Sequence, residues 1–341
     1  MFVVFLFNTM SKPARISYAI MAVLFVLIAW LHLGMLMLTT LFGYFALQRF
    51  TFGGRKYLAV AIYLIVVVAI GCGLFFFSKQ AYKTLPEIAD KTIPAVVNFA
   101  EQQGIELPFT DYASLKTAAI NEFTDSFANL GHYARAAAFE FAQLLIGLVV
   151  AMSMFLSAQW GTEADTQTTR DSLYSTVVVE LSIRFRTFYN SFSKVIGAQI
   201  IISVINTGLT AIFLTVNGYH YVTVILVLTF LCGLLPIIGN LMSNTLIIGV
   251  GFTISPRMAL IALIFLVVIH KLEYFLNSKI IGDRIKNPMW LTLIGLVLGE
   301  KLMGIPGLIL APVVLHYIKV EASRNKMTGP PSASLKTGEA A

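Results

Sequence analysis

Long apolar runs alternate with short polar stretches along the whole chain, and some of the apolar runs are interrupted. Residues 16–47 and 222–252 are each too long for one membrane-spanning helix of ~20 residues and too short for two. Each therefore predicts a hairpin of two short helices, and residues 288–320 predict a third. The breaks are expected at His32 and Gly34, at 236–240 and at 304–307. An interrupted helix needs protein or a water-filled cavity around its freed backbone groups.

Four other apolar runs have the length of full membrane crossings. They are residues 57–77, 139–159, 195–216 and 258–276, the third of them interrupted by Asn206, Thr207 and Gly208. We therefore expect an all-α fold. The chain is predicted to be a polytopic integral membrane protein with about 7–8 hydrophobic segments, including broken or re-entrant helical hairpins.

Polar and apolar spacing divides the chain into four parts. Residues 1–77 form an N-terminal membrane hairpin and the first full span, and residues 78–137 carry mixed charge on an amphipathic helical pattern typical of an extracytoplasmic region. Residues 138–320 form the membrane transport core, which includes a cytoplasmic amphipathic helix at 165–192. Residues 321–341, rich in Ser, Pro, Gly and Ala, predict a disordered cytoplasmic tail.

Composition supports a membrane protein. The chain is 57% hydrophobic and 12% charged, with a mean hydropathy of +0.81, which excludes an ordinary soluble globular protein. The net charge of +7 is spread over short segments beside apolar runs, so it follows the positive-inside rule and argues against nucleic-acid binding. We expect a multi-pass protein of the bacterial inner membrane, in contact with the lipid bilayer, with both termini in the cytoplasm.

Motifs of catalysis are missing from the sequence. There is no Ser/His/Asp set, no metal-ligand spacing and no phosphate-binding glycine loop in a strand–turn–helix context. Cys72 and Cys232 lie far apart in apolar runs and predict buried, unpaired thiols. The sequence therefore predicts a protein that is not an enzyme and that uses no cofactor or metal.

Two runs of residues carry a resemblance to a known family. Residues 230–240 read Phe-Leu-Cys-Gly-Leu-Leu-Pro-Ile-Ile-Gly-Asn, which is similar to the Pro-x-x-Gly segment of the AI-2E family of membrane transporters. Residues 281–288 and 299–312, with Gly-Asp-Arg, Gly-Glu-Lys and Gly-Ile-Pro-Gly, are similar to its C-terminal signature. The resemblance implies export of small solutes, with sodium or lithium exchange for protons in some members. The chain departs from the family pattern at Gly233, where an acidic residue is common, and at Asn287, where a histidine is common.

Ionisable residues inside apolar runs are the first candidates for the transport path, because leaving them in hydrocarbon costs about 2.5–3.5 kcal/mol each. Glu300 and Lys301 stand in the third hairpin, and Glu300 is a candidate proton or cation carrier. The alternative is a hairpin tip at which both charges are simply solvated. Asp283 and Arg284 are expected to pair at the cytoplasmic mouth, whereas His270, Lys271 and Glu273 are expected to reach the interface from the end of a span.

Residues at the two later breaks form the second group of candidates. Half-helix ends and amides could coordinate an ion or a solute there, or the breaks could only make the chain turn. The candidates are Pro236, Gly239, Asn240, Asn244, Gly304, Pro306 and Gly307.

The sequence thus predicts a transporter that exports or exchanges a small solute or ion. The solute would be a signal molecule, or the transport would be an exchange of the Na⁺/H⁺ type. The path would be lined by the broken hairpins 222–252 and 290–318. The alternative is a membrane scaffold or assembly protein that acts through its 78–137 region. Small residues and large amphipathic helices are compatible with a homo-oligomer.

Overall fold

The computed structural model describes residues 11–51, 53–104, 130–157, 172–235, 238–281 and 288–324. Every regular element in these ranges is an α-helix, which confirms the all-α prediction. In chain order the helices are α2 (Lys12–Trp30), α3 (Gly34–Arg49), α4 (Lys56–Gln102), α6 (Leu130–Leu156), α7 (Leu173–Val216), α8 (Val222–Gly233), α9 (Ile238–Ile254), α10 (Pro256–Ile281), α11 (Met289–Met303) and α12 (Ile305–Arg324).

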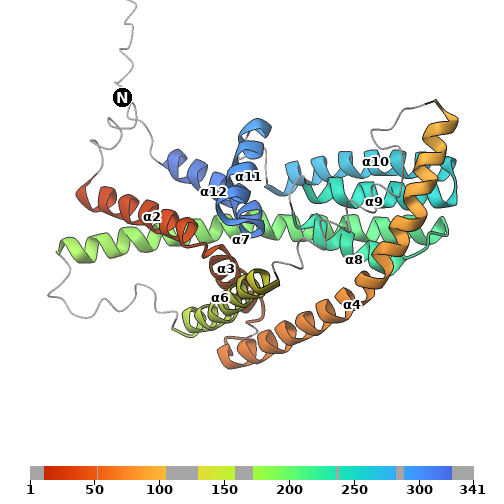
Figure 1. The fold of residues 1–341 in the computed structure, drawn as a ribbon. Coiled ribbons are helices and arrows are strands. Elements are labelled where there is room, and N and C mark those ends of the chain that lie inside the picture. Colours follow the sequence, from red (N-terminus) through yellow and green to blue (C-terminus); the bar gives the residue numbers. More distant parts are fainter. Residues whose placement is uncertain are drawn as a thin grey trace, which may run out of the picture.

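Helix α7 is the axis of the molecule. Its 44 residues make a rod about 66 Å long, roughly twice the hydrocarbon thickness of a bilayer. Helices α2 and α12 pack along its N-terminal half, whereas α8 and α10 pack along its C-terminal half (Figure 1). The separate amphipathic helix expected at 165–192 is therefore not separate, because from Leu173 onward it is continuous with the span that follows. The interruption expected at Asn206 is also wrong, since the helix runs through it.

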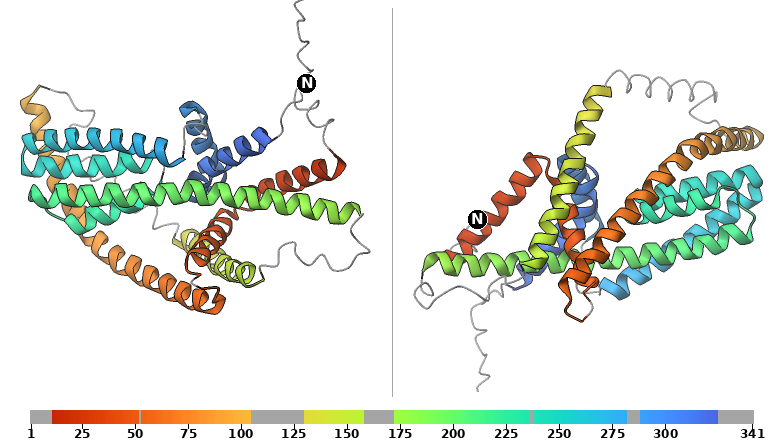
Figure 2. Two further views of the ribbon diagram at one scale, coloured as in Figure 1. Left: turned by 180° about the vertical axis from the view of Figure 1, so that it is seen from behind. Right: turned by 90° about the horizontal axis from the view of Figure 1, so that it is seen from below.

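Helix α4 is the second long rod. It continues without a break from the apolar run 57–77 into the charged stretch, through Pro86 and Pro94, and ends at Gln102 beside Gly104, whose φ is +65°. The end of α4 crosses over α8 and α9, as both views of Figure 2 show. The remainder of the region expected outside the membrane, residues 105–129, lies outside the described residues.

Side chains of α4 fix this crossing. Ile88 is buried in a core with Leu214, Ile225 and Ile247, and the ring of Phe99 lies 5.2 Å from that of Phe252. Outside this core Lys91 and Tyr221 both donate hydrogen bonds to Glu87, at 2.9 and 2.7 Å, and these bonds lower the pKa of the Glu87 carboxyl. The charged half of α4 is therefore attached to the C-terminal group of helices, which consists of the C-terminal half of α7 with α8, α9 and α10.

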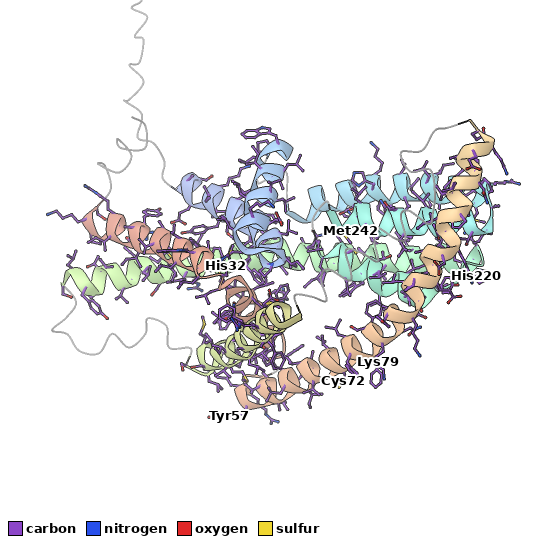
Figure 3. All side chains as sticks on the ribbon, viewed as in Figure 1. His32, Tyr57, Cys72, Lys79, His220 and Met242 are labelled. Carbon is purple, nitrogen blue, oxygen red and sulfur yellow. The ribbon has the colours of Figure 1, made fainter. Side chains whose placement is uncertain are left out.

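The first half of α4 is buried at Ala59 and Tyr63, which pack with Leu47 and Ala151, but most of its other side chains are exposed. Figure 3 marks Tyr57 near its start and Cys72 and Lys79 along its middle, and all three side chains are exposed. Cys72 is therefore not the buried thiol that the sequence predicts, whereas Cys232 is buried. In an apolar helix of this kind, exposure to the surroundings means exposure to lipid or to another protein surface.

The three predicted breaks are confirmed. Helices α2 and α3 are separated at His32, which has a φ of +52°; α8 ends at Gly233 and α9 starts at Ile238; α11 and α12 are separated at Gly304, with a φ of +63°. In the two later pairs the helices pack on each other, α8 on α9 and α11 on α12. In the first pair the two helices pack mainly on other helices, α2 on α7 and α3 on α6. Whether any pair enters and leaves the bilayer on one side stays a prediction.

Length and apolar composition make five described helices long enough to cross a membrane. They are Lys12–Trp30, Lys56–Gln102, Ala137–Leu156, Leu173–Val216 and Ile305–Ser323, with Val222–Gly233 and Gly239–Ile254 as shorter apolar helices. The chain is a multi-pass membrane protein, and its segment count of 7–8 stays a prediction. Helix α12 reaches Arg324, so the first residues expected in the disordered tail are helical.

Candidate functional site

A small polar cavity lies where α7, α8, α9 and α10 meet. Its volume is about 20 Å³, enough for one particle the size of a water molecule. Polar side chains come from all four helices. The lining residues are Asn206, Thr210, Thr229, Gly233, Asn240, Ser243, Asn244, Ile247, Leu266, Ile269, His270 and Glu273.

Glu273 supplies the negative charge of this cavity. Its side chain is 9% exposed, and its Oε2 atom accepts a hydrogen bond of 2.6 Å from Nδ2 of Asn240. In the described part of the chain no Lys, Arg or His forms an ion pair with it. A buried carboxylate without a cation is costly, because one amide donor replaces only part of its hydration. A cation beside the carboxylate would offset this cost.

Asn206 brings a second oxygen to the cavity from the C-terminal half of α7. The residue is 7% exposed, and its Oδ1 atom has no hydrogen-bond donor among the described residues. A buried amide oxygen without a partner costs about 1–3 kcal/mol. With Thr210 one turn further along α7, it presents oxygen atoms toward a space that can hold one small particle.

Small residues let the four helices approach closely enough to form the cavity. A Cβ atom on Gly239 would lie 1.6 Å from the carbonyl oxygen of Cys232, so α9 touches the backbone of α8 there. On the other side of α8, Nε2 of Gln199 donates to the carbonyl oxygen of Gly233 at 2.6 Å, and Oγ of Ser203 donates to that of Phe230 at 2.8 Å. Side chains of α7 thereby bind carbonyl groups that the end of α8 leaves without a helical partner.

The chemistry of the cavity favours a monovalent ion. One carboxylate with amide and hydroxyl oxygens offers oxygen ligands of the type that hard cations prefer, and its single negative charge is balanced by one proton or one monovalent cation. Among the described residues no three His, Cys, Asp or Glu side chains gather to hold a metal ion of the usual protein type. The volume is too small for an organic solute in this conformation.

The residues predicted from the second break partly coincide with the cavity. Asn240 and Asn244 line it, and Gly239 makes the contact of α9 with α8. Pro236, Asp283 and Arg284 lie outside the described residues. The sequence interpretation of Glu273 as a side chain that reaches the interface is wrong, because it is buried inside the helical group.

The residues predicted from the third hairpin lie elsewhere. Glu300 and Lys301 are both exposed, with 3.6 Å between Nζ of Lys301 and Oε2 of Glu300. Gly307 packs against Gly299, so that a Cβ atom on Gly307 would lie 1.8 Å from the carbonyl oxygen of Gly299. Gly304 makes the turn of this hairpin and Pro306 packs near Gly34. Helices α11 and α12 pack on α2, α3 and α7, so the third hairpin joins the N-terminal group of helices.

A second buried polar cluster joins α2, α7 and α12. Arg184, 4% exposed, donates from Nη1 to the carboxylate and the carbonyl oxygen of Glu180, and its guanidinium lies 4.0 Å from the ring centre of Tyr18. The hydroxyl of Tyr18 donates to Oε1 of Glu321 at 3.1 Å. The cluster holds one guanidinium and the carboxylates of Glu180 and Glu321, and its contacts connect three helices.

The sequence signal for Glu273 was present but misleading. His270, Lys271 and Lys279 surround it in the chain, and cations near the end of an apolar run usually mark an interface. The helical period is the signal that places Glu273 correctly. It puts Glu273 on the same face of α10 as Leu266, Ile269 and His270, and this face lines the cavity.

These observations define a class: a multi-pass helical membrane protein with a buried carboxylate in a polar cavity between apolar helices. Such intramembrane ionisable groups mark ion and substrate pathways. The model of the AI-2E family transporter matches residues 2–323, and the chain belongs to this family. A curated relative, the "Putative transport protein YdbI" of Bacillus subtilis (strain 168), is 28% identical over 142 residues. That match covers 41% of this chain and 41% of the relative.

Proposed function

We propose that the protein exchanges protons for a small monovalent cation across the membrane, and that the two compete for Glu273. The buried carboxylate, with an amide donor and no cationic partner among the described residues, is the observation that carries this proposal. A proton and a cation cannot both neutralise one carboxylate, so binding of one releases the other. Competition at a single group is sufficient for exchange if the site opens to the two sides in turn.

The cavity supports an ion better than a signal molecule. Its volume of about 20 Å³ admits one water-sized particle. Export of an organic solute would need the helices around it to separate. Helix α9, which starts after a break and touches α8 through Gly239, is the element best placed to move.

Orientation in the membrane follows from charge. We propose cytoplasmic termini in a bacterial inner membrane, because Lys12 and Arg15 flank α2 and Lys319 and Arg324 end α12. The pairs α8–α9 and α11–α12 are proposed to be re-entrant, and the exposed apolar half of α4 is proposed to contact lipid or further copies of the chain.

The experiment is cation exchange in proteoliposomes. Purified protein is reconstituted with an acidic interior, and uptake of radioactive sodium and alkalinisation of the interior are recorded together. We expect Glu273→Gln to abolish both signals, because an amide takes up no proton and supplies no negative charge to balance the cation. Glu101→Gln, which changes an exposed carboxyl at the end of α4, is the matched control and should leave both unchanged.

Variants of Glu300 decide between the two charged candidates. Loss of exchange in Glu300→Gln together with normal exchange in Glu273→Gln would contradict the proposal and move the path to α11. No flux from correctly inserted wild-type protein under any gradient would favour the scaffold alternative, with the 78–137 region as its acting part.

A further inference from the structure

His270 stands beside Glu273 on the same face of α10. The two residues are three positions apart, which places their side chains next to each other on the helix surface, and both line the cavity. They differ in exposure: His270 is exposed, whereas Glu273 is 9% exposed. The imidazole therefore lies between the surroundings of the helical group and the buried carboxylate.

The helices that face this pair carry almost no other ionisable group. Helices α8 and α9 contain no Asp, Glu, Lys, Arg or His, and α7 contains none from Val195 to its end; the thiol of Cys232 on α8 is the exception. On α10 itself, Lys271 is exposed and lies one position further round the helix. Among the residues that line the cavity, His270 and Glu273 are the ones with a basic or an acidic side chain.

We infer that His270 carries protons between water outside the cavity and the carboxylate of Glu273. This inference rests on the proposed exchange function and adds the route by which its proton arrives. Histidine is the side chain whose charge ordinarily changes between pH 5 and 8. A neutral imidazole takes a proton from hydronium, which breaks an O–H bond, forms an N–H bond and leaves water. The imidazolium then passes a proton to the Glu273 carboxylate, directly or through the single water that the cavity can hold. This second transfer breaks an N–H bond and forms an O–H bond, and the imidazole returns to its neutral state.

A proton carrier affects rate and leaves equilibrium affinity unchanged. Removing it therefore separates the speed of exchange from the binding of the cation. General acid–base groups contribute about 10²–10⁴-fold to proton-transfer steps. In His270→Gln we expect exchange to slow by at least about tenfold, with equilibrium binding of radioactive sodium within about twofold of wild type.

The experiment measures both quantities on the full-length protein. Exchange is followed in proteoliposomes, and sodium binding is measured on detergent-solubilised protein at the same pH. Small imidazole buffer is then added to the liposomes, since free imidazole can replace a missing proton carrier at an accessible position. We expect it to restore part of the exchange rate in His270→Gln. The control, Lys271→Gln, changes an exposed cation on the same turn and should exchange at the wild-type rate.

Three results would overturn the inference. His270→Gln could exchange as fast as wild type, it could lose equilibrium sodium binding, which would make His270 a ligand, or its slow exchange could be unaffected by imidazole. Failure of the proposed function appears differently, because Glu273→Gln would then bind and exchange sodium normally whatever His270 does.

Discussion

At the scale of single residues, the cavity combines two features that ordinary cores avoid. Glu273 is a buried carboxylate without a cationic partner in the described residues, and Asn206 has a buried oxygen without a donor there. Each costs free energy in the unliganded protein, and one cation placed between them would relieve both costs. The interpretation of the cavity as a cation site follows from this pairing of an unsatisfied charge with an unsatisfied dipole.

Substitution of Asn206 by Leu tests the amide oxygen. The change keeps the branched shape and the number of side-chain heavy atoms but removes an acceptor worth about 1–3 kcal/mol, so sodium affinity should fall by about 5- to 150-fold. Thr215→Ala is the control, because the Thr215 hydroxyl bonds only to carbonyl oxygens of its own helix. Equilibrium binding of radioactive sodium measures both. Unchanged affinity in Asn206→Leu would remove this amide from the site.

At the scale of helices, the sequence predicted where helices break and failed to predict where they continue. Gly304 breaks the chain because Gly permits a positive φ, and a second break lies between the end of α8 at Gly233 and the start of α9 at Ile238. Polar residues were a poorer guide. Asn206 interrupts an apolar run in the sequence, yet a helix tolerates it because backbone hydrogen bonds do not depend on side-chain polarity. Similarly, α4 continues through Pro86 because its charged half is attached to α8 and α9.

Close contact of α8 and α9 predicts a strong effect of Gly239→Ala. The added Cβ would lie 1.6 Å from the Cys232 carbonyl oxygen, so the two helices must separate. Overpacking of this kind costs about 1–3 kcal/mol or more, and we expect both a lower melting temperature and weaker sodium binding. Gly208→Ala is the control, because nothing lies within 4 Å of its added Cβ and Ala favours a helix by about 1 kcal/mol over Gly. Wild-type stability and binding in Gly239→Ala would contradict the described packing.

At the scale of the whole molecule, α7 connects two groups of helices with different contents. The Arg184 cluster and the cavity at Asn206 lie 22 residues apart on it, about 33 Å along the axis. The first contains an ion pair between Arg184 and Glu180, and the second contains a carboxylate without a cation among the described residues. Sequence alone did not reveal this division, because residues that meet in each cluster come from helices far apart in the chain, such as Tyr18 with Glu321 and Asn240 with Glu273.

This division predicts that stability and binding can be changed separately. Arg184→Met keeps an unbranched side chain but leaves Glu180 and the ring of Tyr18 without their partner, which should cost about 1–3 kcal/mol of stability. Sodium affinity should stay within about twofold of wild type, because sites this far apart without shared partners act independently. Thermal unfolding and sodium binding on one preparation measure the two effects. A large loss of affinity at full stability would show that the Arg184 cluster belongs to the transport site.

Competition between the proton and the cation is the central claim, and equilibrium sodium binding as a function of pH tests it most directly. The apparent dissociation constant of the purified protein should rise as the pH falls, by up to about tenfold per pH unit, because each proton bound to Glu273 excludes one cation. Protons should be released to an unbuffered solution when sodium is added, and Glu273→Gln should show neither effect. Sodium binding that is independent of pH, with no proton release, would contradict the account.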